Sequence, residues 1–481
     1  MQPYLTSASS FMSDEKTFSS NDSKLVKVVA VNIVDIGSST TSSVRSTESE
    51  WNAGSIKCLL GAIVVEWMTW GFPLSYGILQ RYYLSSDSEY HNETTYLTMI
   101  GTIAIGAPYC LGILSVLPLT RWPQYRRSMV MTGCFICAIS LLASSFGTKL
   151  WHLLLTQGIG YAAGFICLYN PLLSMLNEWY SEKRGIAYGI LSSVAGTSGL
   201  TIPYILDIGL RRYGHAITLQ ASALLFTIVL GPSMLLIQPK PSQVSAPTMV
   251  EHESVCTISL SVDGLEVQEV KSSPSLGRIT RMPKFIIFTW SNVFQGIFNL
   301  MPALWIPTYA VALGLTTEQG TLLLVILNIA STISQFLTGW ISDRALAIPI
   351  ATSSLVSAIA AFALWYPSST NTDLGFNILL GFVILYGLSA GGYSVFYGRF
   401  IMELSDDKDK AMWLWSFFEF ERGIGIVIGG PISGMMVDNV MEGSSYGLVI
   451  LLTGVFMAIS SLSIIGWVFV RKEKSSLPGS V

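Results

Sequence analysis

Long apolar segments are the feature that most constrains the fold of this 481-residue chain. Hydrophobic residues make up 51% of it and charged residues 12%, about half the charged share of an ordinary soluble domain. A helix needs about 20 apolar residues to cross the hydrocarbon core of a bilayer. We therefore predict an all-α integral membrane protein with twelve transmembrane helices in two six-helix bundles. The segments are 56–80, 96–118, 128–147, 151–176, 184–206, 215–237, 285–309, 320–341, 347–366, 375–400, 411–437 and 446–470.

A polar linker separates the first six segments from the last six. It is rich in proline, serine and charged residues, and such a composition is typical of a loop or a disordered segment. The first 50 residues include 18 serines and threonines and contain no apolar run of spanning length. The predicted parts are a disordered cytosolic tail at 1–55, a bundle at 56–237, a cytosolic linker at 238–284, a second bundle at 285–470 and a cytosolic tail at 471–481.

The basic residues predict the orientation in the membrane. If both termini are cytosolic, 22 of the 27 lysines and arginines fall on the inner side, as the positive-inside rule requires. Removing one span would invert every later loop and destroy this bias. The same topology places the sequon Asn92-Glu93-Thr94 in an outer loop, where Asn92 can be glycosylated.

Glu66 is an acidic residue inside the apolar stretch CLLGAIVVEWMTWGFPLSYGILQ, residues 58–80. It follows Lys57 by nine residues, about 13 Å along a helix axis, which is near the middle of a ~30 Å hydrocarbon layer. An acid at this depth is costly and indicates a function. A buried carboxyl without a cation beside it can take up and release a proton, so Glu66 is a candidate for proton coupling. The alternatives are a static pair with a basic group and a position facing the inner vestibule.

Three motifs and one loop resemble a known family. GWISDR, at Gly339–Arg344, is similar to the G-x-x-x-D-R loop of the major facilitator superfamily. YGILQRYY (76–83), NEWYSEKRGIAYGI (177–190) and ERGIGIVIGGPISG (421–434) resemble its fungal monocarboxylate-porter-like branch. The resemblance covers roughly residues 55 to 470. It implies two bundles that work by alternating access, and a cell-membrane location with several spans.

The resemblance also implies a gate. Its residues would be Gly339, Asp343 and Arg344, with Asp343 facing the positive end of the helix that begins near Arg184. That contact would hold the inner side closed. The corresponding loop of the first half departs from the pattern, because Thr120 stands where an acid is expected.

A second departure concerns the solute. Carriers of this branch use an aspartate and an arginine in the eighth helix to move small carboxylates with a proton. Here Gln335 stands about where the arginine would be, and no acid precedes it. Simple proton–monocarboxylate symport is therefore not inherited, whereas export of fungal metabolites, proposed for several members, remains compatible.

In this fold the first, fourth, seventh and tenth helices line the central pathway. Amide, phenol and indole groups in an apolar wall suit an amphipathic organic solute, although each can also form an ordinary hydrogen bond between helices. Asn292, Gln295 and Asn299 have the spacing of residues on one helix face. The candidates are Glu66, Trp70, Tyr76, Gln157, Tyr161, Asn170, Asn292, Gln295, Asn299, Asn328, Gln335 and Tyr393.

Arg422 is a further candidate because it is the only lysine or arginine well inside a predicted span, whereas Lys57, Arg184 and Arg399 lie at the ends of theirs. It could bind an anionic solute or pair with an acid. Glu419, three residues earlier, can pair with it on the same helix.

Together these features predict a secondary active transporter that moves a small organic solute, a carboxylate-like molecule or a secondary metabolite, by import or efflux, with or without protons. The alternative is a transporter-like receptor that binds such a solute without moving it. An enzyme is not expected, because the four histidines are scattered and no GxSxG, HExxH or P-loop motif occurs. We expect a monomer in a lipid bilayer with no cofactor or metal, and the net charge of −3 does not suggest a nucleic-acid partner.

Overall fold

The computed structural model describes residues 51–85, 90, 93–180, 184–239, 275–342, 344, 346–368, 375–405, 407–438 and 446–476. Every regular element in these ranges is a helix. The predicted tail before residue 51, linker residues 240–274 and the last five residues lie outside the described chain, and so do Asn92 and Asp343.

The N-terminal helices begin with a well-capped α2. Asn52 accepts a hydrogen bond from Ser55 N at 2.8 Å, and Ser55 Oγ accepts one from Asn52 N at 3.0 Å. Pro73 precedes the break between α2 and α3. The helices are α2 (Ala53–Leu74), α3 (Tyr76–Tyr83), α4 (Thr94–Arg121), α5 (Arg126–Ser144), α6 (Leu150–Leu153), a π-helical turn at Leu154–Gly160, α7 (Tyr161–Trp179) and α8 (Arg184–Leu236).

Gly214 divides α8 into two helical parts. Its φ of 75° and ψ of 178° lie outside the helical region, in a conformation that glycine adopts without a Cβ clash. The two parts match the predicted segments 184–206 and 215–237. Predicting two helices here was therefore correct, with a tight glycine corner as the only connection between them.

The C-terminal helices follow the linker. The predicted segment 285–309 is divided between α10 and α11, with Pro302 near the start of the second. The elements are α9 (Leu276–Ile279), α10 (Pro283–Phe298), α11 (Met301–Ala312), α12 (Thr317–Ser342), α13 (Ala347–Ala360), a π-helical turn at Ala361–Trp365, α14 (Tyr366–Ser368), α15 (Gly375–Ala390), α16 (Phe396–Leu404), α17 (Lys408–Asp438) and α18 (Gly447–Ser476).

Nine helical stretches in the described ranges are long and apolar enough to cross a membrane. One of them, Gly189–Leu236, covers most of two predicted segments, 184–206 and 215–237. The segments 285–309 and 411–437 are not among the nine. The first is split between two shorter helices, and the second carries Glu419, Glu421 and Arg422 within α17. The structure is thus that of an all-α membrane protein, and the number twelve stays a prediction.

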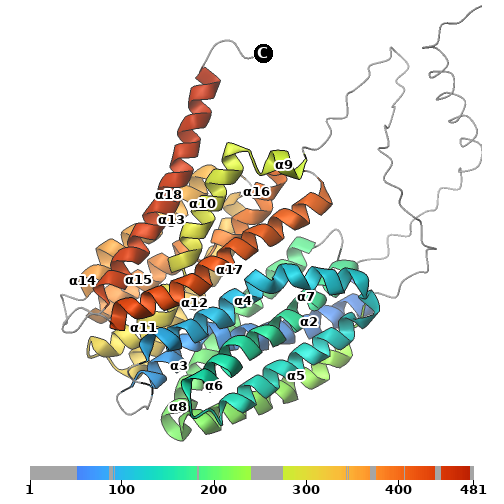
Figure 1. Ribbon diagram of the computed structural model, residues 1–481, viewed down its shortest axis with the longest axis vertical. Helices are drawn as coiled ribbons and strands as arrows, with labels where there is room; N and C mark the ends of the chain where they lie inside the picture. Colours follow the sequence, from blue (N-terminus) through green and yellow to red (C-terminus); the bar gives the residue numbers. More distant parts are fainter. Residues whose placement is uncertain are drawn as a thin grey trace, which may run out of the picture. The chain divides into compact units, whose positions relative to one another are not determined.

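The N-terminal and C-terminal helices meet along three contacts. α4 packs along α17, α8 packs against α12, and α3 packs against α11 (Figure 1). Small residues allow the first contact, since a Cβ added to Gly434 would lie 2.5 Å from Thr95 Cα. Close backbone approach through glycine is the usual way for helices to associate in lipid.

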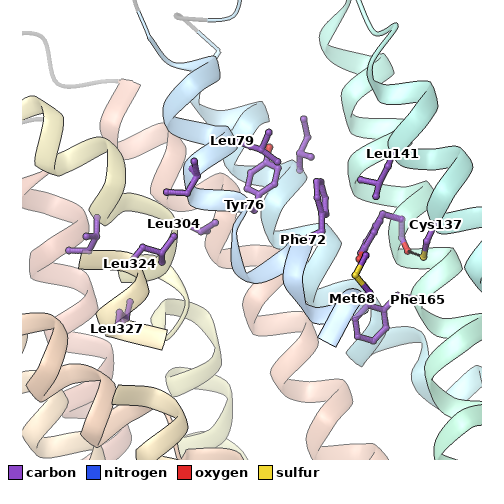
Figure 2. Close-up of a cluster of buried hydrophobic side chains, with 14 of the residues drawn as sticks. Met68, Phe72, Tyr76, Leu79, Cys137, Leu141, Phe165, Leu304, Leu324 and Leu327 are labelled. Carbon is purple, nitrogen blue, oxygen red and sulfur yellow. Dashed lines mark hydrogen bonds between the residues drawn. The ribbon is translucent and has the colours of Figure 1, made fainter. Parts of the chain in front are cut away.

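Apolar packing continues across the same region. Figure 2 shows buried side chains from α5 and α7 next to Met68 and Phe72 of α2, followed by Tyr76 of α3 and then Leu304 of α11. These side chains belong to one cluster that joins the two sets of helices. The polar groups described next are therefore set in a largely apolar surrounding.

Candidate functional site

An ion-pair network joins the two sets of helices at one end, which we call the Arg81 end after its central residue. Arg81 of α3 pairs with the fully buried Asp207 of α8. The same guanidinium donates from Nη1 to the carbonyl oxygen of Thr317 at 2.8 Å and to Thr321 Oγ1 at 3.1 Å. Arg81 therefore ties α3 and α8 to α12.

Arg211 adds a second, more exposed link at this end. Its Nη2 lies 2.9 Å from Asp207 Oδ2, and its Nη1 lies 2.6 Å from Glu318 Oε1. Arg211 therefore also connects α8 with α12. Neither arginine was predicted as a site residue, although Arg81 lies in the motif YGILQRYY. Asp207, which directly follows the predicted span 184–206, could have identified the network. An acid at the end of a membrane span usually pairs with a basic residue.

Glu66 lies at the centre of an aromatic group. Only 2% of the residue is exposed, and Tyr169 Oη donates to Oε1 at 3.4 Å. Oε2 has no hydrogen-bond partner among the described residues. Trp70, one turn later, lies beside the carboxyl, although its Nε1 does not reach hydrogen-bonding geometry. None of the ion pairs formed within the described chain includes Glu66.

Trp70 connects this group to the α4–α17 contact. Its ring centroid lies 5.0 Å from that of Phe165, 6.0 Å from that of Tyr169 and 6.1 Å from that of Tyr109. Tyr109 of α4 interacts electrostatically with Glu66, and also with Glu419 and Arg422 of α17. The Tyr109 phenol is thus an electrostatic neighbour of ionisable groups from both sets of helices.

Arg422 is buried where α17 meets α4 and α10. A Cβ added to the neighbouring Gly423 would lie 2.7 Å from the backbone nitrogen of Cys110, and one added to Gly296 would lie 3.2 Å from Arg422 O. Arg422 Nη1 and Glu419 Oε2 both lack a hydrogen-bond partner in the described part of the chain. The two residues act on each other electrostatically without forming an ion pair of ordinary length.

Two amides on α10 and a third directly after its last residue differ in their contacts. Asn292 donates to Phe418 O at 2.9 Å and to Glu421 Oε2 at 3.3 Å, and accepts from Tyr397 Oη at 2.5 Å. Gln295 is 1% exposed, yet neither of its amide atoms has a partner among the described residues. The side-chain Oδ1 of Asn299 also lacks a partner in the described chain, while its backbone carbonyl oxygen accepts a hydrogen bond from Tyr386 Oη at 3.2 Å.

Four of the N-terminal candidates form hydrogen bonds between helices. Such bonds are sufficient to explain the burial of Tyr76, Tyr161 and Asn170, so they support packing without indicating solute contact. For Gln157 they account for Nε2 only, because its Oε1 has no partner in the described chain. The donors and acceptors are Tyr76 Oη to Leu97 O at 2.8 Å, Gln157 Nε2 to Tyr83 Oη at 2.9 Å, Tyr161 Oη to Thr69 O at 2.7 Å and Asn170 Nδ2 to Ser115 Oγ at 2.7 Å.

The C-terminal candidates are more varied. Asn328 Nδ2 donates to Gly199 O at 2.9 Å, which joins α12 to α8. Tyr393 Oη lies 2.8 Å from Ser291 Oγ. Gln335 is partly buried on α12. Asn328 therefore contributes to the contact between the two sets of helices, whereas Tyr393 packs within the second set.

The gate motif is only partly visible. The Arg344 guanidinium lies 3.6 Å from the centroid of the Trp340 ring, a cation–π contact at the end of α12. A Cβ added to Gly339 would have Val395 as its nearest neighbour, at 3.7 Å. Since Asp343 lies outside the described residues, its pairing across the halves stays a prediction, as does the glycosylation of Asn92.

Residues 58–420 match the sequence profile of the Major Facilitator Superfamily. The chain belongs to this superfamily. Among its relatives, the MFS transporter asaE of Aspergillus flavus is 25% identical over 403 residues, which cover 83% of each chain. The agnestins efflux protein AgnL12 of Paecilomyces divaricatus is 21% identical, with 89% of this chain and 92% of that one covered. Monocarboxylate transporter 12 of Xenopus laevis is 22% identical, with 69% and 72% covered.

Solved structures agree with this family on the fold. The nucleoside transporter NupG superposes with a TM-score of 0.60 at 13% identity, covering 86% of this chain and 99% of that one. A D-xylose-proton symporter gives 0.62 at 15% identity, covering 85% and 96%. This major facilitator protein is therefore a multi-span secondary transporter, and the family and fold are non-enzymatic.

Proposed function

We propose that this transporter moves a small organic solute, a carboxylate-like molecule or a secondary metabolite, out of the cell with proton coupling through Glu66. The observation that carries the proposal is the unpaired Oε2 of a carboxyl that is almost completely buried. In a membrane interior such a group is retained for a function. It can change its protonation state as the surroundings change, which is what coupling requires.

The proposed moving units are the bundles 56–237 and 285–470. The contacts of Arg81 and Arg211 support a state in which the Arg81 end is closed. The distribution of lysine and arginine supports placing that end outside, with both termini in the cytosol. Outward release would then require the contacts of α12 with Arg81 and Arg211 to break.

Proton coupling would use the neighbours of Glu66. Tyr169 donates to the charged or the neutral carboxyl, and Trp70 lies beside it. The aromatic rings around it offer an apolar surface to an organic solute. Solute and proton would thus meet in the same part of the pathway, beside the α4–α17 contact.

The relatives support the direction and the class of solute. AgnL12 is named as an efflux protein for agnestins, and monocarboxylate transporter 12 is named for monocarboxylates. We extend both only as far as "organic, with an acidic group, exported across the cell membrane". No observation favours the receptor alternative over transport.

Flux in reconstituted vesicles tests the proposal. The purified full chain would be placed in liposomes with an imposed pH gradient, and flux measured for a panel of radiolabelled organic acids. We expect the gradient to drive flux in the wild type and in E93Q, which changes an exposed carboxyl, and not in E66Q. Gradient-driven flux that survives in E66Q would refute coupling through Glu66. Solute binding with no flux in the wild type would instead establish the receptor alternative.

A further inference from the structure

We propose that Arg422 binds the carboxylate of the solute, assisted by Gln295, and that Glu419 is the internal carboxylate that the solute displaces. The inference rests on the proposed function in assuming a transported organic solute, and it specifies the chemistry that holds that solute. It places the anion on α17 and α10, and not on the eighth helix, where Gln335 offers no charge.

The contrast between two buried arginines supports this assignment. Arg81 is satisfied by Asp207, Thr317 and Thr321. Arg422 is buried as well, at 9% exposure, but its Nη1 has no acceptor within the described chain. A buried guanidinium with unused donors is costly, and its planar fork fits a carboxylate through two parallel hydrogen bonds.

Gln295 is the second unsatisfied group in this region. It precedes Gly296, which allows α10 to approach the backbone of Arg422 closely. The preceding turn of α10 is already occupied, because Asn292 bonds to Phe418 O and to Glu421. Gln295 therefore offers an NH2 group with two N–H donors and a carbonyl acceptor, all unused in the described chain, to a ligand next to the guanidinium.

Glu419 explains how a buried cation is tolerated without a bound solute. It lies three residues before Arg422 on the same helix, and its Oε2 is unpartnered in the described chain. The two groups interact electrostatically without an ion pair of ordinary length. The charge of the guanidinium is therefore offset, while its Nη1 stays free, within the described residues, to donate hydrogen bonds. A solute carboxylate with better geometry can replace Glu419 as the partner of Arg422.

Tyr109 and Tyr397 complete the surroundings of the guanidinium. Both phenols interact with Arg422, the first from α4 and the second from α16. Tyr397 is held by its hydrogen bond to Asn292 Oδ1. The proposed site therefore has its cation on the C-terminal helices and an aromatic wall contributed by both sets, which suits an aromatic monocarboxylate.

Ligand-induced thermal stabilisation of the purified full chain tests this inference. The probes are aromatic monocarboxylates, with 4-phenylbutyrate as the first, and their primary amides as uncharged counterparts. We expect the acids, and not the amides, to raise the melting temperature of the wild type. R422Q should lose this effect, and R422K, which keeps the charge without the fork, should need about tenfold more acid.

Two further variants separate the roles of the carboxyls. In E419Q the internal competitor is gone, so we expect half-maximal stabilisation at about tenfold lower acid concentration. E421Q is the matched control. Because Glu421 already accepts a hydrogen bond from Asn292, this substitution should leave the stabilisation by acids unchanged. Melting temperatures without ligand establish that each variant is folded.

Several outcomes would overturn the inference. They are equal stabilisation by amides, retained stabilisation in R422Q, no stabilisation of the wild type by any acid of the panel, or E419Q and E421Q behaving alike. The proposed function is tested separately. It predicts that E66Q is still stabilised by the acids and loses gradient-driven flux, and flux retained in E66Q would refute that function without affecting the assignment of Arg422.

Discussion

Arg81 and Asp207 form an ion pair between α3 and α8 with both side chains buried, and the same arginine reaches the backbone of Thr317 on α12. Breaking a buried pair by removing one partner costs about 3–5 kcal/mol, because the other charge is left without compensation. Here Arg211 remains beside Asp207, so part of the loss is recovered. The pair therefore holds the Arg81 guanidinium in place, and the bonds from Arg81 to Thr317 O and Thr321 Oγ1, which cross to α12, hold the Arg81 end closed.

We predict that R81Q opens the Arg81 end more often. Thr98 is fully buried close to Gln80 at this end, so a cysteine at position 98 reports opening. In a background without the six native cysteines, labelling of T98C by a membrane-impermeant thiol reagent should become about tenfold faster or more in R81Q. R212Q, which changes an exposed arginine, is the control. Equal labelling rates in the three backgrounds would show that Arg81 does not hold this end closed.

A second prediction concerns the close contact of α4 with α17. G434A should lower the stability by about 1–3 kcal/mol, because its Cβ would lie 2.5 Å from Thr95 Cα and the helices would have to move apart. G231A is the matched control, since no atom lies within 4 Å of the added Cβ. Thermal unfolding in detergent measures both. A melting temperature of G434A equal to that of G231A would contradict the close packing.

The third prediction compares the neighbouring amides of α10. Q295M should leave the stability of the empty protein unchanged or higher, because the buried amide has no partner to lose in the described chain. N292L should be destabilised by about 1–3 kcal/mol, because Phe418 O, Glu421 and Tyr397 lose their bonds to it. The melting temperatures of the two variants test this prediction. A lower melting temperature of Q295M would indicate that Gln295 has a structural partner.

The fold could be predicted from the sequence because lipid imposes a simple rule. Each long apolar segment must be helical, and the basic residues bias the orientation. The breaks were located only in part. The break at Gly214 falls between two predicted segments, whereas the break near Asn299 divides one, because it depends on neighbours that periodicity does not reveal.

The site could be predicted only as a set of residue types. Glu66 and Arg422 stood out because a charge inside an apolar segment is rare. Tyr161 and Gln157 are polar residues inside apolar segments, as Gln295 is. Tyr161 Oη bonds to Thr69 O and Gln157 Nε2 bonds to Tyr83 Oη, although Gln157 Oε1 has no partner, whereas neither amide atom of Gln295 has a partner in the described chain. Which amide stays unpaired depends on contacts between distant segments, and a single sequence does not contain them.

The central claim is that Glu66 couples solute movement to protons without being needed for the conformational change itself. Solute counterflow separates the two, because exchange of internal for external organic acid requires alternating access and no net proton movement. In proteoliposomes we predict that E66Q keeps counterflow within about twofold of the wild type and loses net flux driven by a pH gradient. Loss of both activities in folded E66Q, or retention of both, would contradict the account.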